Sequence, residues 1–196
     1  MIIHNFQQGT QEWLKCRLGK FGGTDAQAVQ TNGKGLETLC FQKVADLMIG
    51  KPQETYTNTD MERGKELEAS ARLLYELKTG NQVLEVGYCE LDEFTGCSPD
   101  GLVTDDGLIE IKCPSDRVFI EYLYSGKVDK KYYWQMQMQM FVTNRKWCDY
   151  VLYNENLDRI EIERIERNEK DIEKLKEGLK TGITKIKEIM EKINVR

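Results

Sequence analysis

The sequence predicts an α/β fold in which helices flank a mixed central β-sheet. Two observations lead to this fold class. Helical segments alternate with short runs of β-branched and aromatic residues, and no linker or internal repeat divides the chain. The 196 residues, of which 40% are hydrophobic, can bury one good core. We therefore expect residues 1–196 to form a single domain.

The expected elements follow one another closely along the chain. Helices are expected in its first part at Thr10–Leu18, Thr24–Thr31, Leu36–Ile49 and Asp60–Thr79. A strand at Gln82–Glu90 and a β-hairpin come next. They are followed by a helix at Arg117–Ser125 and, later, by strands at Trp147–Tyr153 and Arg159–Ile165.

The segment Lys130–Val142 has two possible structures. Its Gln-Met-Gln-Met-Gln-Met run alternates like a strand, whereas Gln and Met both favour helices. We expect a helix that begins with Lys130 and Lys131.

An amphipathic helix is expected at about residues 168–193. Its apolar residues recur at spacings of three and four and have charged neighbours: Ile172, Leu175, Leu179, Ile183, Ile186, Met190 and Ile193. Such a stripe most often packs on the chain's own core, but its nearly heptad spacing could instead join subunits. Gly178 and Gly182 are expected to weaken the middle of the helix.

The turn residues 105–107 (Asp-Asp-Gly) lie between two apolar runs and predict a β-hairpin. If the loop is these three residues, Asp100 faces Lys112 across the hairpin. Because strand side chains alternate between faces, Asp100, Glu110 and Lys112 then share one face, and the isoleucines between them point into the core. A two-residue loop would shift the register by one and separate Asp100 from the others.

Two carboxylates and a lysine on one face are suited to metal-assisted phosphodiester hydrolysis. Carboxylate oxygens bind Mg²⁺ or Mn²⁺, which keep several waters and can take further ligands from a phosphate. The ion activates a bound water, which Lys112 can orient, or Lys112 can stabilise charge in the transition state. The alternative is an ordinary ion pair between Glu110 and Lys112, which contributes little. The residues alone support both interpretations equally.

Four segments resemble the PD-(D/E)xK nuclease superfamily and, within it, the phage lambda exonuclease family, also described as YqaJ-like viral recombinases. They are residues 7–19 (QQGTQEWLKCRLG), 63–68 (RGKELE), 97–114 (CSPDGLVTDDGLIEIKCP) and 132–139 (YYWQMQMQ). Their order and rough spacing agree with the family, so the resemblance covers about residues 5–155. It implies a restriction-endonuclease-like core.

The resemblance also implies roles for individual residues. Asp100 and Glu110 would bind one or two Mg²⁺ ions, with Mn²⁺ as a possible substitute. The carbonyl of Ile111 would complete the metal shell, and Lys112 would be the catalytic lysine.

Further residues match family positions at the edge of the metal site. Glu68 and Gln135 correspond to a family acid and glutamine, although Glu68 could lie on a solvated helix face and Gln135 could be a polar spacer. The family has an extra acid before the Ser-Pro-Asp block. Asp92 is its closest match here, and Glu90 or Glu93 could take its place.

The resemblance implies a pocket for the 5′-terminal phosphate of DNA. Arg17 corresponds to an arginine that holds this phosphate, and Thr24 and Ser98 correspond to hydroxyl residues beside it. Gln137 and Lys131 are expected to contact DNA as well. The alternative for Arg17 is a cation at a helix end, which is common in the last turn.

Composition and charge limit the other possibilities. The net charge of −5 is unusual for a DNA-binding protein, but the basic residues occur in short clusters. They predict a basic channel in an acidic exterior, with ordinary solvated surface as the alternative.

The single histidine, His4, argues against a Ser-His-Asp hydrolase or a His-ligated zinc enzyme. The six cysteines lack the paired spacing of a disulfide framework or an iron–sulfur cluster. No stretch has the length of a membrane span or the pattern of a signal peptide. We therefore expect a cytoplasmic protein, in a bacterial host if a phage encodes it.

The resemblance implies a Mg²⁺-dependent exodeoxyribonuclease that degrades one strand of linear double-stranded DNA from its 5′ end. The 3′ single strand that remains would feed phage-type homologous recombination. A single-strand annealing protein is the expected partner, and a ring-shaped homotrimer the expected assembly. Two alternatives are open: a structure-specific or restriction-type endonuclease, and a non-catalytic DNA-binding protein.

Overall fold

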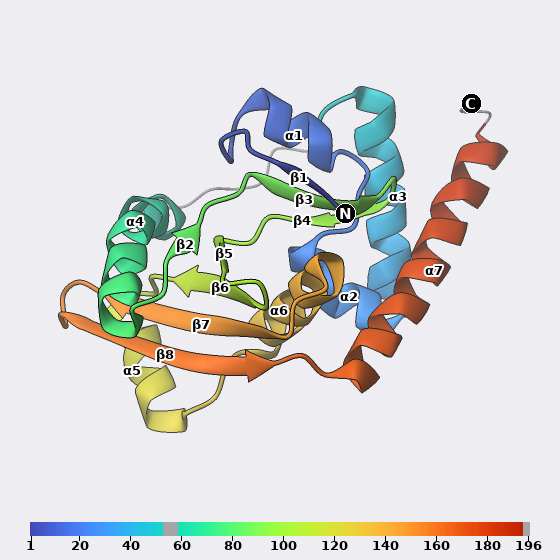
Figure 1. Ribbon diagram of the computed structural model, residues 1–196. Helices are drawn as coiled ribbons and strands as arrows, with labels where there is room; N and C mark the ends of the chain where they lie inside the picture. Colours follow the sequence, from blue (N-terminus) through green and yellow to red (C-terminus); the bar gives the residue numbers. More distant parts are fainter. Residues whose placement is uncertain (53–58, 194–196) are drawn as a thin grey trace.

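The computed structural model describes residues 1–52 and 59–193 and shows a mixed α/β architecture (Figure 1). A five-stranded sheet has the order β2 (Val83–Leu84), β5 (Gly101–Val103), β6 (Gly107–Lys112), β7 (Trp147–Asn154) and β8 (Arg159–Glu166). A three-stranded sheet has the order β1 (Ile2–His4), β3 (Tyr88–Asp92) and β4 (Thr95–Cys97). In the larger sheet β6 and β7 are parallel and the other neighbours antiparallel. The predicted mixed sheet is confirmed.

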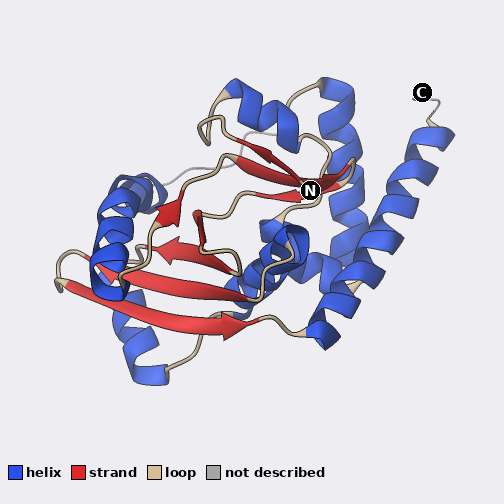
Figure 2. Cartoon of the chain, viewed as in Figure 1, coloured by secondary structure: helices blue, strands red, loops and turns tan. Residues whose placement is uncertain are grey.

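Helices cover both faces of the larger sheet (Figures 1 and 2). On one face α4 (Thr59–Thr79) buries Ala71 and Tyr75 against Ile109 and Ile111 of β6. Two further helices lie on the other face, α5 (Asp116–Ser125) and α6 (Lys130–Thr143), and α7 (Glu169–Lys192) packs against α6. The remaining helices belong to the N-terminal part: α1 (Gln11–Arg17), the short 3₁₀ helix η1 (Gly23–Asp25), α2 (Ala26–Thr31) and α3 (Lys34–Ile49).

The apolar stripe of α7 packs on the chain's own core. Ile172, Leu175 and Ile186 are fully buried, and α7 contacts α2 and α3. The two glycines of this helix allow neighbouring residues to approach its backbone closely. A Cβ on Gly178 would lie 1.9 Å from the carbonyl oxygen of Val29. The expected weakening of α7 is therefore accompanied by a close approach that only glycine permits.

The predicted hairpin has a three-residue loop, but the loop is Thr104–Asp106 instead of residues 105–107. Thr104 takes the left-handed conformation, with φ +50°. Gly107 instead pairs within β6, where a Cβ would lie 2.1 Å from the ring of Trp147. The register moves by two residues, so Asp100 precedes β5 opposite Glu110 and not Lys112. A shift of two conserves the faces, and the predicted side-chain alternation is retained.

Most predicted elements lie within two residues of the observed ones, but the smaller sheet was not predicted. The segment expected as one strand at Gln82–Glu90 is divided between β2 and β3, which belong to different sheets. The chain changes sheets at Gly87, where a Cβ would lie 2.0 Å from the carbonyl oxygen of Phe6. In the part of the chain that the structure describes, no helix has the length and apolar character needed to cross a membrane.

Candidate active site

The buried carboxylate of Glu110 is the centre of the candidate site. The alternation of β6 directs Ile109 and Ile111 toward α4 and Glu110 toward α6. The Lys112 ammonium donates to Glu110 Oε1 at 2.5 Å. From α6, the amide of Gln135 donates to Oε1 at 2.5 Å, and that of Gln139 donates to Oε2 at 2.7 Å. Glu110 is only 1% exposed, so these donors replace the water that it loses.

The alternating glutamines of α6 have two different roles. Gln135 and Gln139 are four residues apart, and so they share the helix face that meets Glu110. Gln137 is fully buried elsewhere: its amide donates to the carbonyl of Glu166 and accepts from the Asn168 amide. Gln137 therefore joins α6 to the start of α7, and its side chain is not exposed for contact with DNA. Gln139 was missed, although the helical spacing from Gln135 could have identified it.

Asp100 lies just before β5, where β6 extends beyond the end of its neighbour. Its Oδ2 accepts the backbone amide of Ile111 at 2.6 Å, in the place where another strand residue would continue the ladder. Glu68 of α4 lies beside it and raises the pKa of the Asp100 carboxyl. The structure thus brings Glu68, Asp100, Glu110 and Lys112 together from α4 and the hairpin.

Burial dominates the electrostatics of these carboxyls. It raises the pKa of Asp100 to about 7 and that of Glu110 to about 7, because the charged form loses its hydration. The two carboxylates also repel each other. Attraction by Glu110 and Asp100 outweighs burial at Lys112 and raises the pKa of its ammonium. Without a metal ion, this ammonium is the compensating charge of the site.

Lys112 and Lys131 lie on the same tyrosine ring at the start of α6. The Lys112 ammonium is 5.2 Å from the ring centroid of Tyr132, and that of Lys131 is 4.6 Å away. Lys131 is exposed and makes a long ion pair of 3.7 Å with Asp129. Its charge is therefore available to solvent close to Lys112.

Trp13 organises the residues that were assigned to the 5′-phosphate pocket. Its indole N–H donates to Ser98 Oγ at 2.9 Å and lies 3.1 Å from the Gly87 carbonyl. The Arg17 guanidinium stacks 3.9 Å above the Trp13 ring, and burial lowers its pKa. It makes no ion pair with any acid among the described residues. Thr24 is exposed in η1. Its neighbour Gly23 lies against the side chain of Gln135.

A cavity of about 630 Å³ connects the two groups of residues. Trp13, Glu68 and Asp100 are among the residues that line it. Arg72 also lines it, with its Nε buried and without a partner in the described part of the chain. A nucleotide end held near Trp13 would thus lie next to the carboxylates.

The candidates for the extra acid lie at the smaller sheet. Asp92 is exposed at the end of β3 and accepts the amide of Phe94 in the turn to β4. Glu90 bonds to His4 and Lys20, and Glu93 is exposed beside Asp92. The structure places none of these three carboxylates among the contacts of Glu110 or Asp100. Glu68 occupies that position instead.

Comparisons with known proteins agree with the resemblance found in the sequence. The model of the YqaJ-like viral recombinase domain matches residues 12–146. No curated protein matches. Among solved structures, the chain is similar to an alkaline exonuclease (LHK-Exo) from Laribacter hongkongensis at 34% identity and a TM-score of 0.87, covering 94% of this chain and 96% of that one. LHK-Exo in complex with dAMP matches equally well.

A more distant structure shares the fold. It is a phage related exonuclease from Haemophilus somnus 129PT, with 15% identity, a TM-score of 0.70, and coverage of 89% of this chain and 96% of that one. The family model spans most of the chain and includes every residue of the Glu110 site. The chain therefore belongs to the YqaJ-like viral recombinase family.

Proposed function

We propose that this chain is a Mg²⁺-dependent 5′-to-3′ exodeoxyribonuclease that degrades one strand of linear double-stranded DNA and leaves 3′ single-stranded overhangs. Its recombinase family and its similarity to an alkaline exonuclease support a nuclease that acts on DNA. The observation that carries the proposal is the convergence of Asp100, Glu110 and Lys112 at the end of β6.

The donor set fits a hard divalent cation. Asp100, Glu110 and Glu68 offer carboxylate oxygens, which suit Mg²⁺ or Mn²⁺, and the Ile111 carbonyl is a further oxygen candidate. Burial raises the pKa of the Asp100 and Glu110 carboxyls, so a bound divalent cation would stabilise their charged forms. One or two bound ions would polarise the scissile phosphoryl group and activate a water.

The chain's own residues supply orientation and charge. Lys112 remains protonated and can stabilise negative charge on the phosphate in the transition state. Gln135 and Gln139 hold the Glu110 carboxylate in one orientation. Asp100 is fixed in the same way by the backbone amide of Ile111. A rigid ligand set of this kind reduces the reorganisation needed during the reaction.

Degradation from the 5′ end requires residues that recognise this end of the DNA strand. Arg17 is a half-buried cation without an ion-pair partner among the described residues, and its guanidinium lies over the Trp13 ring. A guanidinium of this kind is suited to a phosphate. Ser98 and Thr24 would add hydroxyl donors, and Lys131 would hold the strand beside Lys112.

The assembly and partners follow from the family resemblance. We infer a ring-shaped homotrimer around duplex DNA, a single-strand annealing protein as partner, and action in the bacterial cytoplasm of the host. Because most of the α7 stripe packs on the chain's own core, we infer that the ring contacts use other surfaces.

The test uses linear duplex DNA labelled separately at its 5′ and 3′ ends, with and without a 5′ phosphate, and closed circular DNA. We expect Mg²⁺-dependent loss of the 5′ label, stimulated by the phosphate, with the circles intact. Lys112→Ala should abolish cutting. Lys146→Ala is the matched control, because this lysine pairs with Asp106 in the loop of the same hairpin and is 72% exposed.

Arg17→Ala tests the polarity separately from the chemistry. It should remove the stimulation by the 5′ phosphate while ends that carry a 5′ hydroxyl are still degraded. Cutting of circles would favour an endonuclease, and a wild-type chain that binds DNA without cutting would favour the non-catalytic alternative.

A further inference from the structure

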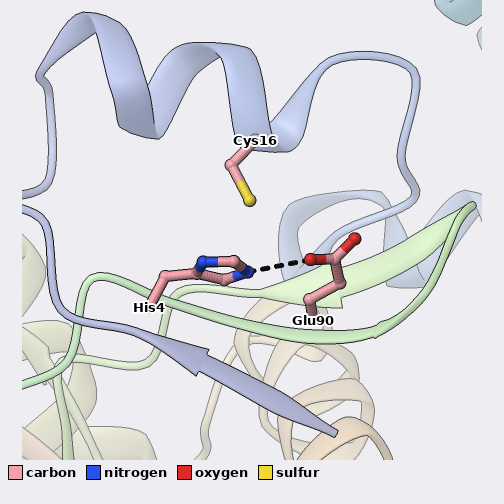
Figure 3. A group of neighbouring side chains, drawn as sticks. All are labelled: His4, Cys16 and Glu90. Atoms are coloured by element: carbon pink, nitrogen blue, oxygen red, sulfur yellow. Dashed lines mark hydrogen bonds and ion pairs between the residues drawn. The ribbon is translucent and has the colours of Figure 1, made fainter.

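Three potential metal ligands converge between α1 and the smaller sheet, apart from the Glu110 site. His4 comes from β1, Cys16 from α1 and Glu90 from β3, and Figure 3 shows the Cys16 thiol pointing toward the other two side chains. One donor atom from each residue lies within 4.8 Å of the others, and all three residues are half-buried. Among the described residues, no other group of three or more His, Cys, Asp or Glu side chains comes this close.

We propose that His4, Cys16 and Glu90 form a binding site for a single zinc ion. An imidazole nitrogen, a thiolate sulfur and a carboxylate oxygen are all zinc ligands, and three protein ligands leave a fourth position for water. The sulfur and nitrogen donors disfavour Mg²⁺, which prefers oxygen. This site would therefore select a different metal from the carboxylate site.

The neighbouring contacts hold two of the ligands in position. The Lys20 ammonium lies 3.0 Å from Glu90 Oε1 and also donates to the backbone carbonyl of Glu93. The other oxygen, Oε2, lies 2.8 Å from His4 Nε2. The His4 ring stacks on Phe6, with the ring centroids 5.3 Å apart. Lys20 thus fixes one carboxylate oxygen and leaves the other facing the histidine.

Charge balance is favourable when zinc is bound. A thiolate and a carboxylate neutralise the divalent ion, and the imidazole remains neutral. The thiol proton leaves to solvent, and the hydrogen bond between His4 and Glu90 is exchanged for two bonds to the ion. Lys20 keeps its contact with Glu90 and acts as a supporting partner of the ligand.

Zinc would join three elements that are distant in sequence. Cys16 is adjacent to Arg17 and lies in the helix that also carries Trp13. An ion at this site would therefore hold α1 against the smaller sheet. Because the unfolded chain lacks this arrangement, zinc should stabilise the folded state.

The experiment uses the full-length protein after treatment with a chelator. Titration with Co²⁺, a spectroscopic substitute for zinc, should produce a thiolate-to-cobalt absorption band that saturates at one equivalent. Zn²⁺ should remove the band and excess Mg²⁺ should not. Cys16→Ser and His4→Gln should lose the band. Cys113→Ser is the matched control, because Cys113 is the other half-exposed cysteine of the chain.

Two further measurements test the site independently of nuclease activity. Zn²⁺ should raise the melting temperature of the wild type and Cys113→Ser but not of Cys16→Ser. In the wild type, Zn²⁺ should slow alkylation of Cys16 by iodoacetamide more than that of Cys113, which needs no variant to fold. A band that survives Cys16→Ser, or wild-type protein with no band and no protection of Cys16, would show that the three residues form only an ion-pair cluster.

Discussion

The hydrogen bond from Gln139 to Glu110 leads to a sharp prediction for Gln139→Leu. Glu110 Oε2 accepts from Gln139 at 2.7 Å, while Lys112 and Gln135 both donate to Oε1. Removal of Gln139 therefore leaves Oε2 without its donor. The carboxylate should rotate more freely, and metal binding and transition-state stabilisation should weaken.

The magnitude follows from the kind of bond that is lost. A hydrogen bond to a charged group contributes about 1.5–3 kcal/mol. If the whole difference appears in the transition state, kcat/KM should fall by roughly 10- to 150-fold. Global stability should fall as well, because the buried Glu110 Oε2 loses its donor, but the loss is reduced because Gln139 Oε1 is itself buried without a partner in the described part of the chain. Leucine removes this unsatisfied acceptor together with the donor.

Gln137→Leu is the matched control on the same helix. Gln137 bonds only to backbone groups of residues 166 and 168. Its replacement should lower the free energy of unfolding by about 1–3 kcal/mol, since two hydrogen bonds are lost. Its kcat and Mg²⁺ requirement should remain those of the wild type at a temperature where the variant is folded.

The assay combines urea unfolding with initial rates on 5′-phosphorylated linear DNA over a range of Mg²⁺ concentrations. The prediction concerns rates measured where both variants are folded: Gln139→Leu is slow, and Gln137→Leu is as active as the wild type. If Gln139→Leu keeps the wild-type rate and Mg²⁺ requirement, or if both variants lose activity equally, the assigned roles of the two glutamines are refuted.

Three further predictions concern other parts of the structure. Trp13→Phe removes the indole N–H that holds Ser98, so stimulation by a 5′ phosphate should fall while ends with a 5′ hydroxyl are cut as before; unchanged stimulation would contradict this role. The folded-state pKa of about 7 for Asp100 and Glu110 lies above that of the unfolded chain, so the metal-free protein should lose stability as pH rises from about 4 to about 7. Mg²⁺ should accordingly raise the melting temperature more above about pH 8 than below about pH 6, and equal shifts would argue against these carboxylates as ligands. Gly178→Ala should destabilise the fold by about 1–3 kcal/mol, because its Cβ would meet the Val29 carbonyl, whereas Gly64→Ala, with nothing within 4 Å, should be neutral or stabilising; denaturant unfolding distinguishes them.

The hairpin shows why side-chain faces were easier to predict than register. The period of two along β6 fixes which side of the sheet Glu110 and Lys112 occupy, whatever the exact loop. The loop itself depends on Trp147, which is forty residues away in sequence and excludes a side chain at Gly107. The residues of the turn give no information about this tertiary contact. Asp100, Glu110 and Lys112 still share one face of the sheet because the register shifted by two residues.

The smaller sheet could not be predicted for a different reason. β1 and β4 are three residues each, too short to show a periodic pattern. They are stabilised by pairing with β3, which local sequence presents as the continuation of β2. The second metal candidate, His4 with Cys16 and Glu90, depends on this pairing and on α1, so spacing along the chain gave no indication of it.

The glutamine run shows how one structural choice decides a set of functional assignments. As a strand, the run would place all three glutamines on one face. As a helix, it separates Gln137 from Gln135 and Gln139 by its period of 3.6 residues. The helix was predicted correctly, and its period directs Gln137 away from Glu110 and toward the backbone of residues 166 and 168. Combining the period with a buried Glu110 selects Gln139 as the second donor, which is the residue that the structure places there.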